Sequence, residues 1–243
     1  MTGTEVVLVA VVVAMAAGVQ TVTGFGFALL AVPFMSLVVP PETAVVIAAT
    51  LGVLTSSGQA WAERAHADRR TVAWMLGGAA VGAPFGFLVL VVTTERQLRL
   101  VLVGVIVTFL AVDLLGRRPS RASRGVDAAA GAVSGALNTA LATNGPPLVM
   151  ALHARHLPPP RFRGTLTAVL AGSGVLTVAL FALGGRYDAD IWWALAAALP
   201  GLGLGFGLGL RHRGRVGPER FRQVVTVLLA VTATVALVGV VRA

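Results

Sequence analysis

The stretch Ala142-Thr143-Asn144-Gly145-Pro146-Pro147 interrupts an apolar run that extends from about residue 126 to residue 152. It contains no charged residue, and glycine and proline both break helices. A second stretch, Thr21-Val22-Thr23-Gly24-Phe25-Gly26-Phe27, interrupts the first apolar run in the same way. Two uncharged breaks at matching places in two halves are typical of transporters whose site lies between discontinuous helices.

The composition indicates an integral membrane protein. Of the 243 residues, 56% are hydrophobic and only 12% are charged, whereas soluble domains carry about 25% charged residues. The net charge of +9 lies in short loops between apolar runs, so it indicates membrane topology and not nucleic-acid binding. The chain contains no cysteine, which excludes disulfides and thiol chemistry. The first 20 residues lack a basic segment, so they are expected to form a spanning helix and not a signal peptide.

The pattern predicts an all-α membrane protein with about ten helical segments. Two segments, 27–39 and 147–157, are too short to cross about 30 Å of hydrocarbon at 1.5 Å per residue. They are expected to be tilted, re-entrant or parts of broken helices. The predicted segments are 4–20, 27–39, 43–61, 71–92, 98–116, 126–142, 147–157, 164–184, 190–210 and 221–241.

All 19 basic residues are arginines, and their distribution predicts an orientation. Fifteen lie in loops 62–70, 117–125, 153–163 and 211–222. Cytoplasmic loops are rich in basic residues, so these four loops are predicted to be cytoplasmic. If all ten segments cross, both termini lie outside. The four remaining arginines are Arg96, Arg99, Arg186 and Arg242.

The two halves of the chain carry matching landmarks. A shift of 119 positions superposes Gly26 on Gly145, and a shift of 124 superposes Glu95-Arg96 on Glu219-Arg220. Five segments per half give the halves opposite orientations, which predicts inverted repeats at 1–120 and 121–243. Gly82-x-x-x-Gly86 and Gly201-x-x-x-Gly205 are expected to be close-packing helix surfaces, located where helices slide past one another or where protomers meet. The shift of 119 also superposes Pro41 on Pro160, Gly82 on Gly201 and Gly86 on Gly205.

Five short motifs occur along the chain: Thr23-Gly24-Phe25-Gly26-Phe27, Val32-Pro33, Pro40-Pro41, Asn144-Gly145-Pro146-Pro147 and Arg161-Phe162-Arg163-Gly164-Thr165. In these motifs the chain resembles the TauE/SafE sulfite exporter family, a group of small bacterial anion permeases. Phe25 and Phe27 stand where family members often carry glycines, and their bulk narrows the break. The resemblance implies a multi-pass protein of the bacterial inner membrane that transports sulfite, an organosulfonate or a related small anion.

A small anion inside a membrane needs hydrogen-bond donors, because an unpaired charge there is costly. Helix N-termini supply free N–H groups and a partial positive charge. The segments that begin near Phe27 and Pro147 offer such ends, and polar side chains beside the breaks can add donors. The alternative is that these side chains only satisfy backbone groups freed by the breaks. The candidate binding residues are Gln20, Thr21, Thr23, Gly24, Phe25, Gly26, Asn138, Thr139, Thr143, Asn144, Gly145, Pro146 and Arg163.

Several other residues have two interpretations. Arg163, at the start of the eighth segment, either recruits anions or only marks the cytoplasmic side. Asp113 either couples transport to protons or pairs with Arg117 four residues on, and the spacing favours the pair. Ser56, Ser57 and Gln59 either line the pathway or bond to neighbouring helices. His153 and His156 do not form a metal site without further ligands.

No enzyme motif or cofactor motif is found in the sequence. The interpretation is a secondary transporter with a small anionic substrate and a lipid bilayer around it, and without a nucleic-acid partner. A carrier for another anion, a channel with a static filter, and a scaffold or intramembrane enzyme are the competing classes. Saturable countertransport distinguishes a carrier from a channel, and any transport excludes a scaffold. Substrate, ion coupling and homodimer formation are left open.

Overall fold

A computed structural model describes residues 3–115 and 122–212 of the chain. The described residues form nine α-helices and one short 3-10 helix, and they contain no strand. The helices are α1 (Gly3–Thr23), α2 (Phe27–Met35), α3 (Pro41–Glu63), η1 (Arg64–His66), α4 (Arg69–Val92), α5 (Glu95–Leu114), α6 (Arg124–Leu141), α7 (Gly145–His153), α8 (Pro159–Leu183) and α9 (Ala189–His212).

Nine of the ten predicted segments correspond to these helices. The two short helices are shorter than predicted, because α2 ends at Met35 and α7 ends at His153, nine residues each. The start of α8 lies at Pro159, whose fixed φ suits a first helical turn. Arg163 therefore lies one turn inside α8 and does not open it. The predicted tenth segment, and Arg117 as the partner of Asp113, lie outside the described residues.

Within residues 3–115 and 122–212, five helices are long and apolar enough to cross a membrane. They are α1, α3 together with η1, α4, α8 and α9. The predicted span at 126–142 corresponds to α6, which is not among the five. Polar residues such as Asp127, Ser134 and Asn138 lie in α6 and are buried against other helices. The polar face of this helix therefore packs against protein, which explains how it tolerates polar side chains, while Val133 elsewhere on the helix is 51% exposed.

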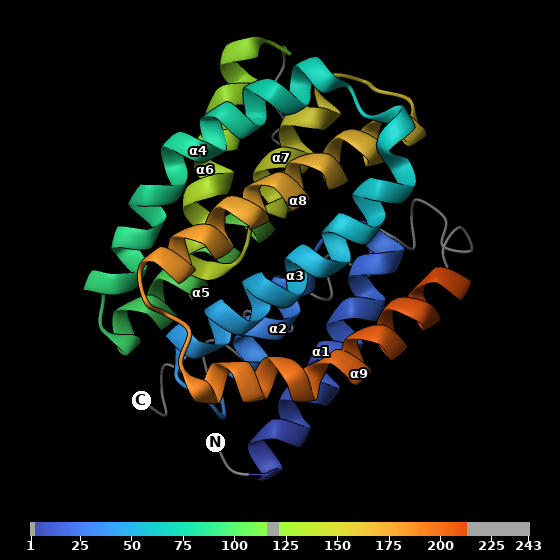
Figure 1. Ribbon diagram of the computed structural model, residues 1–243. Coiled ribbons are helices and arrows are strands. Elements are labelled where there is room, and N and C mark those ends of the chain that lie inside the picture. Colours follow the sequence, from blue (N-terminus) through green and yellow to red (C-terminus); the bar gives the residue numbers. More distant parts are fainter. Residues whose placement is uncertain (1–2, 116–121, 213–243) are drawn as a thin grey trace.

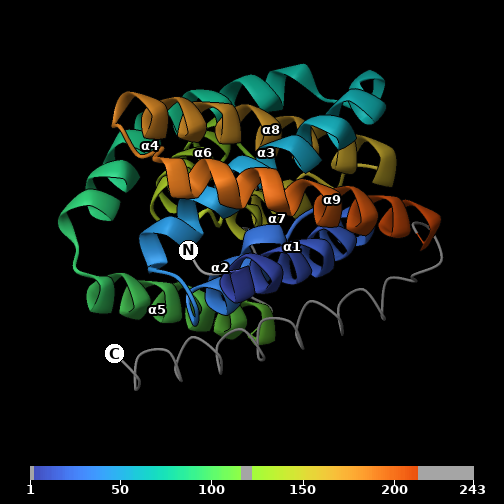
Figure 2. The same cartoon turned by 60° about the horizontal axis from the view of Figure 1, so that its bottom comes forward.

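The bundle is held together by pairs of helices that are distant in the sequence. Figures 1 and 2 show α4 beside α6, α1 beside α9, and α8 between α3 and α4. Two of these pairs approach closely through glycines. A methyl group at Gly82 of α4 would lie 1.9 Å from the carbonyl oxygen of Ala132 in α6, and one at Gly205 of α9 would lie 2.0 Å from that of Ala14 in α1. The predicted Gly-x-x-x-Gly surfaces thus pack within one chain.

Candidate functional site

The first break lies between α1 and α2 and depends on two glycines. Gly24 and Gly26 have φ angles of 87° and 97°, a region that L side chains rarely adopt. The Thr23 hydroxyl lies 2.8 Å from the carbonyl oxygen of Val19 and also donates to that of Phe25. Thr23 therefore stabilises the break, while Gly26 directs the first turn of α2 toward the centre of the bundle.

The second break lies between α6 and α7 and contains a strained residue. Ala142 ends α6 with a φ of 56°, in the left-handed region. Its N–H donates to the carbonyl oxygen of Asn138 at 2.7 Å, and the Ser134 hydroxyl donates to that of Asn144 at 2.8 Å. Strained backbone at such a position is held by its surroundings and is common at functional sites.

The two breaks meet in the centre of the protein. A methyl group at Gly145 would lie 2.7 Å from Cδ2 of Phe25, so the start of α7 touches the first break directly. Between them lies a hollow, the central cavity, with about 30 Å³ for the centres of water-sized molecules. That is room for about two waters. Its lining residues are Gln20, Phe25, Gly26, Phe27, Ala28, Leu29, Ala48, Ala49, Gly52, Val53, Ser56, Asn138, Ala142, Thr143, Asn144, Gly145, Leu170 and Gly174.

Both short helices present their N-terminal ends to the central cavity, but they are not equivalent. The first turn of α2 has backbone N–H groups at Phe27, Ala28 and Leu29, which have no partner within the helix. The first turn of α7 has an N–H at Gly145, but Pro146 and Pro147 have none. The two ends therefore do not supply equal numbers of backbone donors. The α2 end is the richer source of backbone donors.

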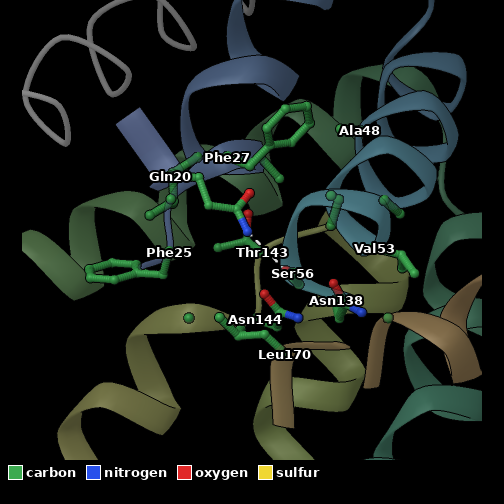
Figure 3. Close-up of a pocket in the computed structure, with 18 residues that line it drawn as sticks. Gln20, Phe25, Phe27, Ala48, Val53, Ser56, Asn138, Thr143, Asn144 and Leu170 are labelled. Carbon is green, nitrogen blue, oxygen red and sulfur yellow. Dashed lines mark hydrogen bonds between the residues drawn. The ribbon is translucent and has the colours of Figure 1, made fainter. Parts of the chain in front are cut away.

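Three side-chain amides, from Gln20, Asn138 and Asn144, also line the cavity (Figure 3). Gln20 Nε2 donates to Ser56 Oγ at 2.9 Å, and Asn144 Nδ2 donates to Ser173 Oγ at 3.2 Å. An amide NH₂ group has two N–H donors, so Gln20 and Asn144 each have a second donor that can serve a ligand. Asn138 differs, because its Nδ2 donates to both Ser173 and Thr177.

None of the 18 lining residues is charged. The electrostatics of the cavity are therefore set by backbone and amide dipoles. The partial positive charges of two helix N-termini favour an anion over a cation. An uncharged site can also release its ligand, since no fixed ion pair has to be broken.

A family model described as "Sulfite exporter TauE/SafE" matches residues 8–236 of the chain. The chain belongs to the TauE/SafE family. This confirms the resemblance on which the sequence interpretation relied. Neither a curated protein nor a solved structure matched the chain.

The TauE/SafE motifs predicted to bind substrate are only partly gathered at the central cavity. The seven candidates that line it are Gln20, Phe25, Gly26, Asn138, Thr143, Asn144 and Gly145, and Ser56 of the predicted pathway joins them. The other candidates do not line it: Thr21, Thr23, Gly24, Thr139, Pro146, Arg163, Ser57 and Gln59.

Most of the candidates outside the cavity have identifiable partners. The hydroxyls of Thr21 and Thr139 donate to carbonyl oxygens one turn back in their own helices, at 2.7 and 3.0 Å. Gln59 Nε2 donates to the carbonyl oxygen of Gln20. Arg163 lies at the end of the bundle, 3.6 Å from the carboxylate of Glu63. These contacts favour a supporting role for these TauE/SafE residues in this conformation.

Sequence reasoning missed three hydroxyl side chains that hold the amides in place. Thr55 Oγ1 donates to Gln20 Oε1 at 2.8 Å, while Ser173 and Thr177 hold the asparagines. All three are buried. The sequence could have identified them as candidates, because each is a hydroxyl residue within a long apolar span. Their partners lie 29 to 39 positions away in the sequence, so the pairing itself was not visible.

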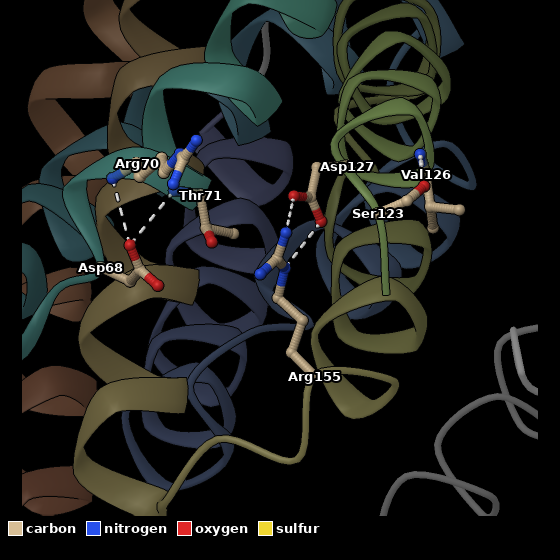
Figure 4. Close-up of polar contacts among 7 residues, drawn as sticks. All are labelled: Asp68, Arg70, Thr71, Ser123, Val126, Asp127 and Arg155. Atoms are coloured by element: carbon tan, nitrogen blue, oxygen red, sulfur yellow. Dashed lines mark hydrogen bonds and ion pairs between the residues drawn. The ribbon is translucent and has the colours of Figure 1, made fainter. Parts of the chain in front are cut away.

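A buried ion pair was also missed. Asp127, in the first turn of α6, is fully buried and accepts two hydrogen bonds from Arg155, as Figure 4 shows. The hydrogen bond that Arg155 donates to the Asp127 carboxylate raises the pKa of Arg155, although burial opposes the rise. The pair joins the start of α6 to the turn after α7. It does not line the central cavity of this TauE/SafE protein.

Proposed function

We propose that the protein is a secondary transporter that exports sulfite, or a related small sulfur-containing organic anion, across the cytoplasmic membrane by alternating access. The central observation is that the N-termini of α2 and α7 open on one buried, uncharged cavity lined by Gln20 and Asn144. Family membership supports an anion exporter. The small volume supports an anion of a few heavy atoms.

Alternating access requires two arrangements of the same helices, and we propose that inverted repeats at 1–120 and 121–243 provide them. The helix starts support this division, because α7 begins 118 residues after α2 and α8 begins 118 residues after α3. The closest helix pairs, α4 with α6 and α1 with α9, join opposite halves. Relative movement of the halves would therefore change the cavity.

The glycine contacts refine the correspondence between the halves. Gly78 and Gly82 of α4 face Ala128 and Ala132, while Gly201 and Gly205 of α9 face Ala10 and Ala14. Ala10 and Ala14 lie 118 residues before Ala128 and Ala132. In this register Gly82 corresponds to Gly205 and not to Gly201. The sequence alignment at a shift of 119 paired Gly82 with Gly201. The glycine–alanine contacts instead pair Gly82 with Gly205, one helical turn further along α9.

Counterflow in proteoliposomes tests the proposal. Vesicles that contain the purified protein are loaded with unlabelled sulfite and diluted into labelled sulfite. A carrier is expected to accumulate label transiently above equilibrium, with saturable kinetics. Label that only equilibrates, without saturation, would favour the channel alternative. Counterflow with another small anion but not with sulfite would show that the proposed substrate is wrong and that the carrier mechanism still holds. Protein-free vesicles and the Asn144→Asp variant serve as controls.

A further inference from the structure

A second hollow, the outer groove, lies on the outside of α8 between α3 and α4. Its volume for the centres of water-sized molecules is about 630 Å³. Small residues of α8 form its floor, and α3 and α4 form its walls, consistent with the position of α8 between them in Figure 1. Its lining residues are Ser57, Ala60, Trp61, Arg64, Ala67, Arg69, Val72, Ala73, Leu76, Ala168 and Ala171.

The outer groove is basic at one end and apolar at the other. Arg64 and Arg69 lie together at the short connection between the antiparallel helices α3 and α4. From there to Ser57 on α3 is seven residues, or roughly 10 Å at 1.5 Å per residue. Along that length the groove is lined by alanines, Val72 and Leu76. This polarity matches a headgroup followed by an acyl chain.

The two arginines are not neutralised by nearby acids. Among the described residues neither Arg64 nor Arg69 forms an ion pair. The Asp68 carboxylate accepts from the backbone N–H groups of Arg70 and Thr71, and Glu63 pairs with Arg163. The Arg64 guanidinium lies 4.3 Å from the centre of the Trp61 ring and donates to the Trp61 carbonyl oxygen. A guanidinium has five N–H donors, so Arg64 keeps donors for an anion.

We propose that the outer groove binds one anionic diacyl phospholipid. Its phosphate lies between Arg64 and Arg69, and one acyl chain lies along Ala168 and Ala171. Trp61, with 70% of its surface exposed, is a typical interface residue. Basic pockets between helices on the cytoplasmic side bind anionic headgroups. Lipid binding at this groove does not require that the transport proposal or its substrate be correct.

The position of the groove connects lipid binding to the central cavity. On α3, Ser56 lines the central cavity and its neighbour Ser57 lines the outer groove. On α8, Leu170 lines the cavity and Ala171 lines the groove. The layer of α3 and α8 therefore separates lipid from substrate. A lipid held there stabilises whichever arrangement of α3, α4 and α8 keeps the groove open, and the membrane composition thereby biases the transporter.

Fluorescence quenching of Trp61 tests the lipid site. A variant of the full chain with Trp74→Phe, Trp192→Phe and Trp193→Phe retains Trp61 alone. It is reconstituted in dioleoylphosphatidylcholine vesicles that contain increasing fractions of dibrominated phosphatidylglycerol or dibrominated phosphatidylcholine. Phosphatidylglycerol is expected to quench at a lower fraction, by about 5-fold for each arginine that contacts it. Salt is expected to reduce the preference.

Matched variants separate the groove from general surface charge. Arg64→Gln with Arg69→Gln is expected to abolish the preference, whereas Arg96→Gln with Arg211→Gln, at exposed positions outside the groove, is expected to preserve it. Ala168→Phe keeps both arginines but fills the floor, so it should also reduce the preference. Equal quenching by both lipids would overturn the proposal. Absence of quenching by either would mean that residues 213–243 or a second copy cover the groove, which also overturns it.

Discussion

Asn144 is the side chain whose substitution tests the proposed anion site most clearly. It lines the central cavity and uses one amide N–H for Ser173, so the second is available to an anion. Asn144→Asp replaces the donors by acceptors and adds negative charge, and we expect no detectable sulfite binding. Asn144→Ala removes only the hydrogen bond, about 1–2 kcal/mol or about 5–30-fold in affinity. Calorimetric titration in detergent measures both.

A matched control accompanies the Asn144 test. Gln97→Glu makes the same amide-to-acid change at an exposed position outside the cavity and should leave affinity unchanged. All variants are checked for folding by thermal unfolding. Wild-type affinity in folded Asn144→Asp protein would contradict the proposed site and direct attention to Arg163, which lies outside the cavity in this conformation.

Asp68 provides a prediction about stability and pH. Its carboxylate caps α4 (Figure 4). Burial raises the pKa of Asp68, but hydrogen bonds from Thr71 and Arg70, with the charge of Arg161, outweigh it and hold the pKa below the usual 3.8. A lowered pKa in the folded state adds stability above the ordinary pKa, and that stability is lost as pH falls through the lowered value. Asp68→Ala should cost about 1 kcal/mol at neutral pH.

The dependence of stability on pH separates two contributions of Asp68, its negative charge and its hydrogen bonds to the start of α4. Asp68→Asn keeps the acceptor oxygen and should retain most of the stability at neutral pH. Below the ordinary pKa the gap between wild type and Asp68→Asn should close. Denaturant unfolding in detergent at a series of pH values measures this. A gap that stays constant below pH 3.8 would show that Asp68 does not titrate as its hydrogen bonds indicate.

At the residue scale, the sequence predicted the break residues better than their partners. Glycines, prolines and amides are visible in a single stretch, and Gln20 and Asn144 do lie at the cavity. The partner of Asn144 is Ser173, 29 positions away, and no local pattern connects them. Arg155 pairs with Asp127 across 28 positions. Such pairs depend on how helices pack, which local periodicity does not specify.

At the element scale, two glycines of α4 make a matched experiment. A methyl group at Gly82 would lie 1.9 Å from the carbonyl oxygen of Ala132, whereas one at Gly77 would have no atom within 4 Å. Alanine favours helix over glycine by about 1 kcal/mol, but overpacking costs about 1–3 kcal/mol. Gly77→Ala should therefore preserve or raise stability, and Gly82→Ala should lower it. Unfolding in sodium dodecyl sulfate measures both.

The comparison of Gly77 with Gly82 tests the α4–α6 contact itself. Both changes are the same in chemistry and lie in the same helix. Equal stabilities of the two variants would contradict the close approach of α4 to α6 and the contact register built on it. Lower sulfite flux in Gly82→Ala alone, at equal expression, would connect this contact to transport.

Helix existence was predictable from the sequence, and helix ends were less so. Long apolar runs between arginine-rich loops are sufficient to locate α1, α3, α4, α8 and α9. The start of α8 was predicted five residues late, because the prolines at 158–160 were assigned to the loop. The donor-poor start of α7 follows from Pro146 and Pro147 alone, so the unequal N-termini could have been predicted from the sequence.

At the scale of the whole molecule, the sequence did not specify which helices touch. Glycine pairs on α4 and α9 indicated close packing, but the sequence did not show whether their partners lie in this chain or in a second protomer. The structure places α4 against α6 and α1 against α9. Each pair joins residues from the two proposed halves. Because the two halves pack against each other, the cavity is lined by residues from both. A single break in the sequence therefore could not show which residues surround it.

The orientation of the molecule is the final prediction, and the chain suits its test because it contains no cysteine. A single cysteine can be placed at exposed positions such as Ala65, Ala122 or Ala189. The arginine distribution predicts that Ala65→Cys and Ala122→Cys react with a membrane-impermeant maleimide only from the cytoplasmic side. Ala189→Cys should react only from outside, and a C-terminal reporter should also be external. An external Ala122→Cys would invert the orientation. Residue 189 follows α8, so residues 65 and 189 should lie on opposite sides if α8 crosses the membrane once. Labelling of both from the same side would contradict that crossing. It would also contradict the opposite orientation of the two halves, which the proposed alternating access requires.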